Sequence, residues 1–146
     1  MGVDNNNFRK DLDFGKYYED QFIKEYTEEF DEAIPAPNKS FPDWDWNVRR
    51  GNTWTKYEVK SDKRACDTGN IFVEFRHTNK PSGISISKSD LYVFFIINKN
   101  QLVDVFEVET KILKEMCDSG KYQTRVCYND GFNKSEGYVI PLKEFS

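Results

Sequence analysis

Three acidic residues and a lysine lie on either side of one turn signal in the first half of the chain. They are Asp43 and Asp45 before the turn, and Glu58 and Lys60 after it. Carboxylates gathered around an ammonium group are costly in free energy unless a cation neutralises them. The residue types therefore indicate a divalent-metal site, provided that the fold brings the two segments together.

A β-hairpin is the element that would bring them together. Gly51-Asn52 is a turn signal for a two-residue hairpin loop. The resulting register places Asp45 opposite Glu58. It also places Asp43 opposite Lys60, and the side-chain period of two points all four residues to one side of the sheet. The other side is the predicted core face, formed by Trp44, Trp46, Val48, Thr55, Tyr57 and Val59.

The two aspartates compete for the role of primary metal ligand. Opposite side chains in a hairpin have Cβ atoms about 4.5–5.5 Å apart, which is close enough for Asp45 and Glu58 to chelate one ion. The carbonyl oxygen of Val59 would assist them. Asp43 would then orient Lys60 or bind a second ion, and a change of one residue in the loop length would reverse this preference.

Length and composition predict one globular domain over residues 1–146, with the first ten residues flexible. The chain is 38% hydrophobic and 16% aromatic, with no apolar run of membrane-spanning length and no signal-peptide pattern at its start. An odd number of cysteines without Cys-x-x-Cys spacing favours a reduced, cytoplasmic protein. The net charge of −4 argues against simple electrostatic binding of nucleic acid. It does not exclude a phosphodiester substrate, because bound metal makes an acidic surface attractive to phosphate.

A helix precedes the hairpin. Asp11 or Asp13 would cap it, and apolar residues at helical spacing continue to about Asp31. Glu19 projects into the apolar stripe of this helix, so it either serves a site or occupies a tolerated edge position.

Further elements follow from periodicity and turn residues. The hairpin strands are predicted at about 42–50 and 53–61, and residues 91–97 read as a strand buried on both faces. A helix is expected over about 107–117, ending at Gly120. Additional strands are expected at 71–75, 102–106, 123–128 and 137–140.

The order of helix, hairpin and strand, with Glu19, an aspartate at 43 or 45, and Glu58-x-Lys60, resembles the PD-(D/E)XK nuclease superfamily. Segments 57–62, 68–74, 82–84 and 137–142 are similar to small phage-type nucleases of its resolvase-like branch. The resemblance implies an α/β fold with a mixed central β-sheet flanked by helices, a restriction-endonuclease-like core. It also implies DNA endonuclease activity that depends on Mg²⁺ or Mn²⁺, in a phage-encoded protein acting on DNA in the host cytoplasm.

The same resemblance assigns roles to particular residues. Glu58 matches the acidic ligand of the signature, Lys60 matches its lysine, and Glu19 matches the first-helix glutamate. Asp43 follows a proline as the family signature requires, although Asp45 is the residue opposite Glu58. Substrate contacts are expected from Glu74, Thr68, Asn70, Arg76 and Arg64. Many related enzymes act as homodimers.

Two other classes of protein stay open. A catalytically inactive module with the nuclease fold would bind DNA or an assembly without cutting. An RNA-directed nuclease is a further alternative, although no aromatic RNA-binding signature supports it. His77 is the single histidine, which excludes chemistries that need two.

Overall fold

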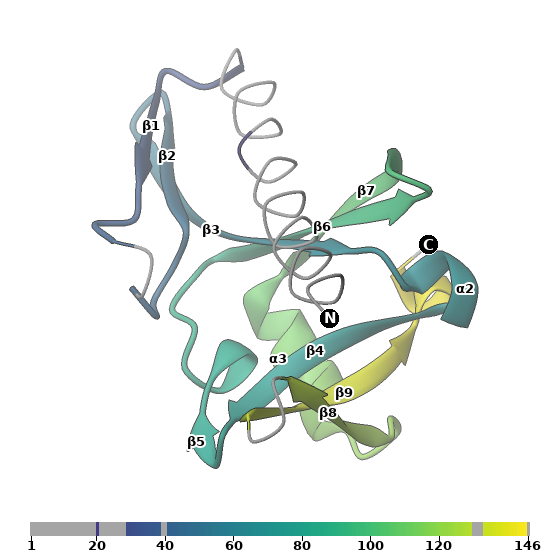
Figure 1. The fold of residues 1–146 in the computed structure, drawn as a ribbon. Coiled ribbons are helices and arrows are strands. Elements are labelled where there is room, and N and C mark those ends of the chain that lie inside the picture. The colour runs from purple at the N-terminus through teal and green to yellow at the C-terminus, as the bar shows by residue number, and fades with distance from the viewer. Residues whose placement is uncertain (1–19, 21–28, 39–40, 130–132, 146) are drawn as a thin grey trace, which may run out of the picture.

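The computed structural model describes Asp20 and residues 29–38, 41–129 and 133–145. Within these residues the protein is a mixed α/β structure made mostly of strands, which form two sheets (Figure 1). The five-stranded sheet has the order β1-β2-β3-β6-β7. Its strands are β1 (Glu32–Pro35), β2 (Trp46–Arg50), β3 (Thr53–Asp62), β6 (Leu91–Asn98) and β7 (Gln101–Glu109).

The second sheet has four strands in the order β5-β4-β9-β8. They are β4 (Asn70–His77), β5 (Lys80–Pro81), β8 (Thr124–Asn129) and β9 (Asn133–Pro141). The described helical segments are α2 (Ala65–Thr68), η2 (Gly83–Ser85), α3 (Thr110–Asp118) and η3 (Leu142–Phe145).

The β2–β3 hairpin has the predicted register. Trp46 pairs with Tyr57 and Arg50 pairs with Thr53, so Gly51-Asn52 is the two-residue loop. Gly51 has a φ of +61°, and a type II′ turn requires a positive φ at this position. On the predicted core face, Val48, Tyr57 and Val59 are buried and Trp46 packs against them. Trp44 lies before the paired region and contacts Phe41 edge-to-face, and Thr55 is half-buried.

Strand β6 forms the centre of the five-stranded sheet. It runs parallel to β3 and antiparallel to β7, and six of its eight residues are buried. A strand covered on both faces needs apolar residues at successive positions, which is why the run 91–97 predicted it correctly. The β6–β7 turn at Lys99 and Asn100 has two positive φ values of +50° and +64°.

The five-stranded sheet is mixed, as expected for the central sheet, but a second sheet accompanies it because the chain reverses direction after β3. The carboxylate of Asp62 accepts hydrogen bonds from the N–H groups of Arg64 and Ala65, which starts the short helix α2. Gly69, with a φ of +74°, ends it in a left-handed conformation. Strand β4 then leaves in a new direction and pairs with β9, so the second sheet is built from β4 and the C-terminal strands.

The helix predicted over 107–117 begins later than expected. Residues 107–109 still pair with β6, so α3 starts at Thr110 and ends at Asp118. Its buried residues Leu113 and Cys117 join a core with Tyr92 and Phe94 of the first sheet and Ile71 of the second. Figure 1 shows α3 beside the strands of both sheets. The two sheets and α3 therefore enclose the main core, and a second core lies on the other face of the five-stranded sheet.

Two sequence predictions fall outside the described residues. Most of the N-terminal helix predicted from Asp11 or Asp13 to about Asp31, with Glu19 in it, lies outside the described residues, which include only Asp20 and residues 29–31 of that range. None of the described helices is long and apolar enough to cross a membrane.

Candidate functional site: a buried carboxylate pair beside a lysine

The hairpin brings Asp45, Glu58 and Lys60 together. The N–H of Asp45 donates to the carbonyl of Tyr57 at 2.9 Å, which extends the hairpin by one residue and sets Asp45 beside Glu58. The Val59 N–H donates to Asp45 Oδ2 at 2.8 Å. Lys60 Nζ lies 3.6 Å from Glu58 Oε1. Local hairpin geometry alone thus assembles two carboxylates and an ammonium group.

The two carboxyl groups are held in an environment that opposes their negative charge. Glu58 is only 8% exposed. Burial raises the pKa of Glu58 from 4.5 to about 7, the Lys60 ammonium lowers it in part, and the charge of Asp45 raises it further. Burial also raises the pKa of Asp45, against the opposing effects of the Val59 N–H and the Lys60 ammonium. A cation bound between the two carboxylates would relieve this penalty.

Asp43 does not take the place predicted for it opposite Lys60. The β2–β3 ladder begins at Trp46, so Asp43 precedes the paired region. Its carbonyl accepts a hydrogen bond from the Lys88 N–H at 2.8 Å, and its carboxylate lies 4.0 Å from Lys88 Nζ. The loop before β6 therefore draws Asp43 away, and the structure brings together two of the predicted carboxylates instead of three. Within the described residues, no group of three or more metal-ligating side chains occurs.

Glu74 lines a cavity of about 200 Å³ together with Lys60, between the two sheets. Glu74 Oε2 accepts a hydrogen bond from Ser82 Oγ at 3.0 Å, and Glu74 Oε1 lies 3.8 Å from Nδ1 of His77. His77 Nδ1 is also 3.1 Å from the Ser135 hydroxyl. The remaining lining residues are Phe72, Val73, Gly83, Tyr92 and Phe94. Glu74 and Lys60 therefore line the same cavity from different sheets, and the predicted substrate contact of Glu74 stays a prediction.

The turn that contains Thr68 and Asn70, two predicted substrate contacts, is held by its own hydrogen bonds. Thr68 Oγ1 donates to the Arg64 carbonyl at 3.1 Å and accepts from the Asn70 N–H at 3.2 Å. The Asn70 side-chain amide donates to the Thr68 carbonyl at 3.0 Å. These contacts cap α2 and turn the chain into β4, and the predicted substrate contacts of Thr68 and Asn70 stay predictions. Arg64 is exposed at the start of α2.

Three arginine side chains, two on the hairpin and one on β4, are paired with acids. Arg76 Nε lies 3.3 Å from Glu136, Arg49 Nε lies 3.3 Å from Glu32, and Arg50 lies 3.6 Å from Glu29. The predicted substrate contact of Arg76 would have to compete with its ion pair to Glu136.

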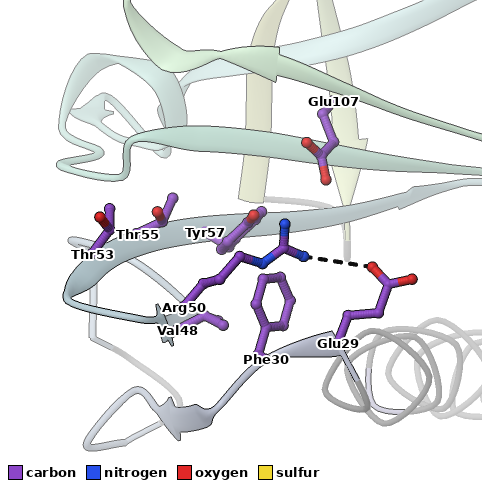
Figure 2. A pocket seen from close by; sticks show the side chains of 8 residues that line it. All are labelled: Glu29, Phe30, Val48, Arg50, Thr53, Thr55, Tyr57 and Glu107. Atoms are coloured by element: carbon purple, nitrogen blue, oxygen red, sulfur yellow. Dashed lines mark ion pairs between the residues drawn. The ribbon is translucent and has the colours of Figure 1, made fainter.

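A larger cavity of about 510 Å³ lies near the hairpin (Figure 2). Figure 2 shows the Arg50 guanidinium over the ring of Phe30, with Tyr57 and Glu107 nearby. The guanidinium carbon is 5.1 Å from the ring centroid. Burial raises the pKa of Tyr57 to about 12, Glu107 adds to the increase, and Arg50 opposes it. Tyr57 is one residue from Glu58 in β3, so its side chain points to the other face of the sheet and this cavity is separate from the carboxylate pair.

Tyr92 is a residue of the site that sequence reasoning missed. It is the direct neighbour of Glu58 in the parallel β3–β6 ladder and lines the same cavity as Lys60. In the sequence it is one member of an apolar run and carries no signal of its own. Only the pairing of β3 with β6 reveals its position.

Gly83 brings η2 against β4 at the rim of the same cavity. Its φ is +52°, and a Cβ atom there would collide with the backbone carbonyl of Glu74. Gly83→Ala is therefore expected to lower the free energy of unfolding by about 1–2 kcal/mol through backbone strain. Overpacking should remove about 1–3 kcal/mol more, as measured by chemical denaturation.

The matched control for this substitution is Gly51→Ala. Gly51 also has a positive φ, of +61°, but a Cβ atom there meets nothing within 4 Å. Gly51→Ala should therefore lower the free energy of unfolding by the cost of backbone strain alone. Equal losses in the two variants would mean that η2 does not pack closely against β4.

Comparison with known proteins adds no relative of this chain. No protein-family model matches it, and no curated protein or solved structure matches it. The resemblance to PD-(D/E)XK nucleases therefore stays a prediction from the residues of the sequence.

Proposed function

We propose that this protein is a divalent-metal-dependent DNA endonuclease of the PD-(D/E)XK type, with a restriction-endonuclease-like core. The observation that carries this proposal is the pairing of the half-buried carboxyl of Asp45 with the buried carboxyl of Glu58, beside the Lys60 ammonium group. Such a pair is unfavourable in the free protein and becomes favourable when a cation binds. The order of strands supports the proposal, because β1, β2 and β3 form an antiparallel meander and β6 then lies parallel to β3.

The donor set fits a hard divalent cation. Two carboxylates and the Val59 carbonyl supply oxygen ligands only, and Mg²⁺ is commonly held by one or two carboxylates with water and substrate phosphate. When bound, the ion would supply positive charge that lowers the pKa of water and offsets the charge growing on the phosphate. Asp45 uses Oδ2 to accept the Val59 N–H, which orients the carboxylate and leaves Oδ1 for the cation.

Lys60 would act on the attacking water and the scissile phosphate. Its ammonium group is near Glu58 and lines the cavity, and 47% of its side chain is exposed, so it can reach a substrate that enters there. Three donors on the ammonium group can hold a water and a phosphate oxygen together. The water oxygen would bond to phosphorus as the bond to the 3′ oxygen breaks, leaving 5′-phosphate and 3′-hydroxyl ends.

A cleavage assay tests this function. Supercoiled plasmid, single-stranded circles and four-way junctions are incubated with protein in Mg²⁺, Mn²⁺ or EDTA. Cleavage of at least one substrate is expected with metal only, and Glu58→Ala should abolish it because half of the carboxylate pair is lost. Glu115→Ala, which removes an exposed carboxylate on α3, is the matched control and should cleave normally.

A second candidate function is a nuclease-fold module that binds DNA or an assembly without cutting. It is favoured by the deep burial of Glu58 and by its contact with Lys60, which together resemble a structural ion pair. DNA binding without cleavage in any divalent metal would support this module and exclude the enzyme. No cleavage and no binding of DNA would contradict both proposals.

A further inference from the structure

Tyr92 is placed where it can act on the carboxylate pair. It lies in β6 directly beside Glu58 of β3, and the parallel ladder points both side chains to the same face of the sheet. Its side chain is only 2% exposed. Tyr92 also lines the cavity of about 200 Å³ that contains Lys60.

The hydroxyl group of Tyr92 is buried without a satisfied hydrogen bond. It lies near the Ser87 side chain, but no partner of acceptable geometry is found within the described part of the chain. Burial raises the pKa of Tyr92, and the negative charge of Glu58 raises it further, so the hydroxyl keeps its proton. An unpaired donor in the core costs free energy that phenylalanine would avoid. The Tyr92 hydroxyl can therefore donate a hydrogen bond to a nearby group that becomes negatively charged or to a ligand that binds there.

We propose that the Tyr92 hydroxyl is a positioning group that donates a hydrogen bond to the Glu58 carboxylate when the site holds a divalent cation. The inference rests on the proposed function. Carboxylates that bind metal are themselves usually hydrogen-bonded by neighbouring groups, and loss of such a partner weakens metal affinity. Lys60 lies near Oε1 of Glu58, and Tyr92 supplies a second donor from the adjacent strand.

Mn²⁺ binding to the full chain tests the role of Tyr92. The dissociation constant is measured by calorimetry and electron paramagnetic resonance for the wild type, Tyr92→Phe and Tyr57→Phe. Tyr92→Phe is expected to weaken Mn²⁺ binding by about 10–100-fold. Without metal, its melting temperature should stay equal to or above that of the wild type, because an unpaired hydroxyl has been removed.

Tyr57→Phe is the matched control, since it removes a buried tyrosine hydroxyl from the opposite face of β3. It should bind Mn²⁺ like the wild type. Equal affinity in Tyr92→Phe and wild type would overturn the role of Tyr92 while leaving the metal site intact. Equal weakening in both variants would assign the effect to general packing and also overturn it. Absence of Mn²⁺ binding by the wild type would instead refute the proposed function and this inference together.

Discussion

Lys60→Ala is expected to lower the rate of metal-dependent DNA cleavage by about 10²–10⁴-fold, the range typical of a positioned group that assists proton transfer. The ammonium group is next to Glu58 at 3.6 Å and opens onto the cavity between the sheets. The protein should remain folded, because a half-exposed strand position tolerates truncation. Initial rates on a labelled substrate, with circular dichroism of the same samples, measure both effects.

Lys56→Ala is the control for this substitution. Lys56 lies on the same strand and the same face as Glu58 and Lys60, two residues from Glu58 in the other direction. Lys56→Ala removes one positive charge from the same face of the strand as Lys60→Ala does. A non-specific loss of attraction for DNA would therefore appear in both variants. A similar loss in the two would exclude a specific role for Lys60. Unfolding of Lys60→Ala alone would show a structural lysine.

The metal-free protein is expected to lose stability as the pH rises from about 4.5 to about 7. The pKa of Glu58 rises on folding from 4.5 to about 7, chiefly because of burial. In this window the folded state keeps a proton that the unfolded state has released, so the unfolded state binds fewer protons and the free energy of unfolding falls. The shift corresponds to a loss of up to about 3 kcal/mol. In EDTA, the melting temperature should therefore fall by about 6–12 °C across the window.

Glu58→Gln should flatten this pH dependence, because the amide has no proton to lose. Glu115→Gln, which alters an exposed carboxyl group on α3, should keep the wild-type profile. Addition of Mn²⁺ above pH 7 should restore stability to the wild type but not to Glu58→Gln. A melting temperature of the wild type that rises between pH 4.5 and 7 would contradict this prediction. It would mean that Glu58 is ionised in the folded protein and that neighbouring groups compensate the cost of burying its charge without metal.

The hairpin part of the candidate site could be predicted from the sequence because its cause is local. Gly51-Asn52 allows a two-residue loop, and that loop fixes the register over the following residues. The side-chain period of two then sets Asp45 and Glu58 on one face and Val48 and Val59 on the other. The buried strand β6 was equally predictable, since an unbroken apolar run suits few other environments.

Asp43 shows where local reasoning stops. The register argument extended the ladder back to Asp43, which instead interacts with Lys88, a residue distant in the sequence. The same holds for Arg76, whose ion pair with Glu136 depends on the pairing of β4 with β9. No pattern in a single sequence identifies which distant residues will become partners, such as Asp43 with Lys88 or Arg76 with Glu136.

The sequence by itself determined that two carboxylates and a lysine meet on one hairpin, because turn chemistry and strand period act over a few residues. Only the tertiary structure decided what covers them. The capped turn at α2 sends β4 into a second sheet, and the parallel pairing with β6 sets Tyr92 against Glu58. The β3–β6 pairing joins residues more than 30 positions apart, so its geometry depends on how whole elements pack and not on any local preference. That packing turns an exposed acidic hairpin into a buried site with a raised Glu58 pKa.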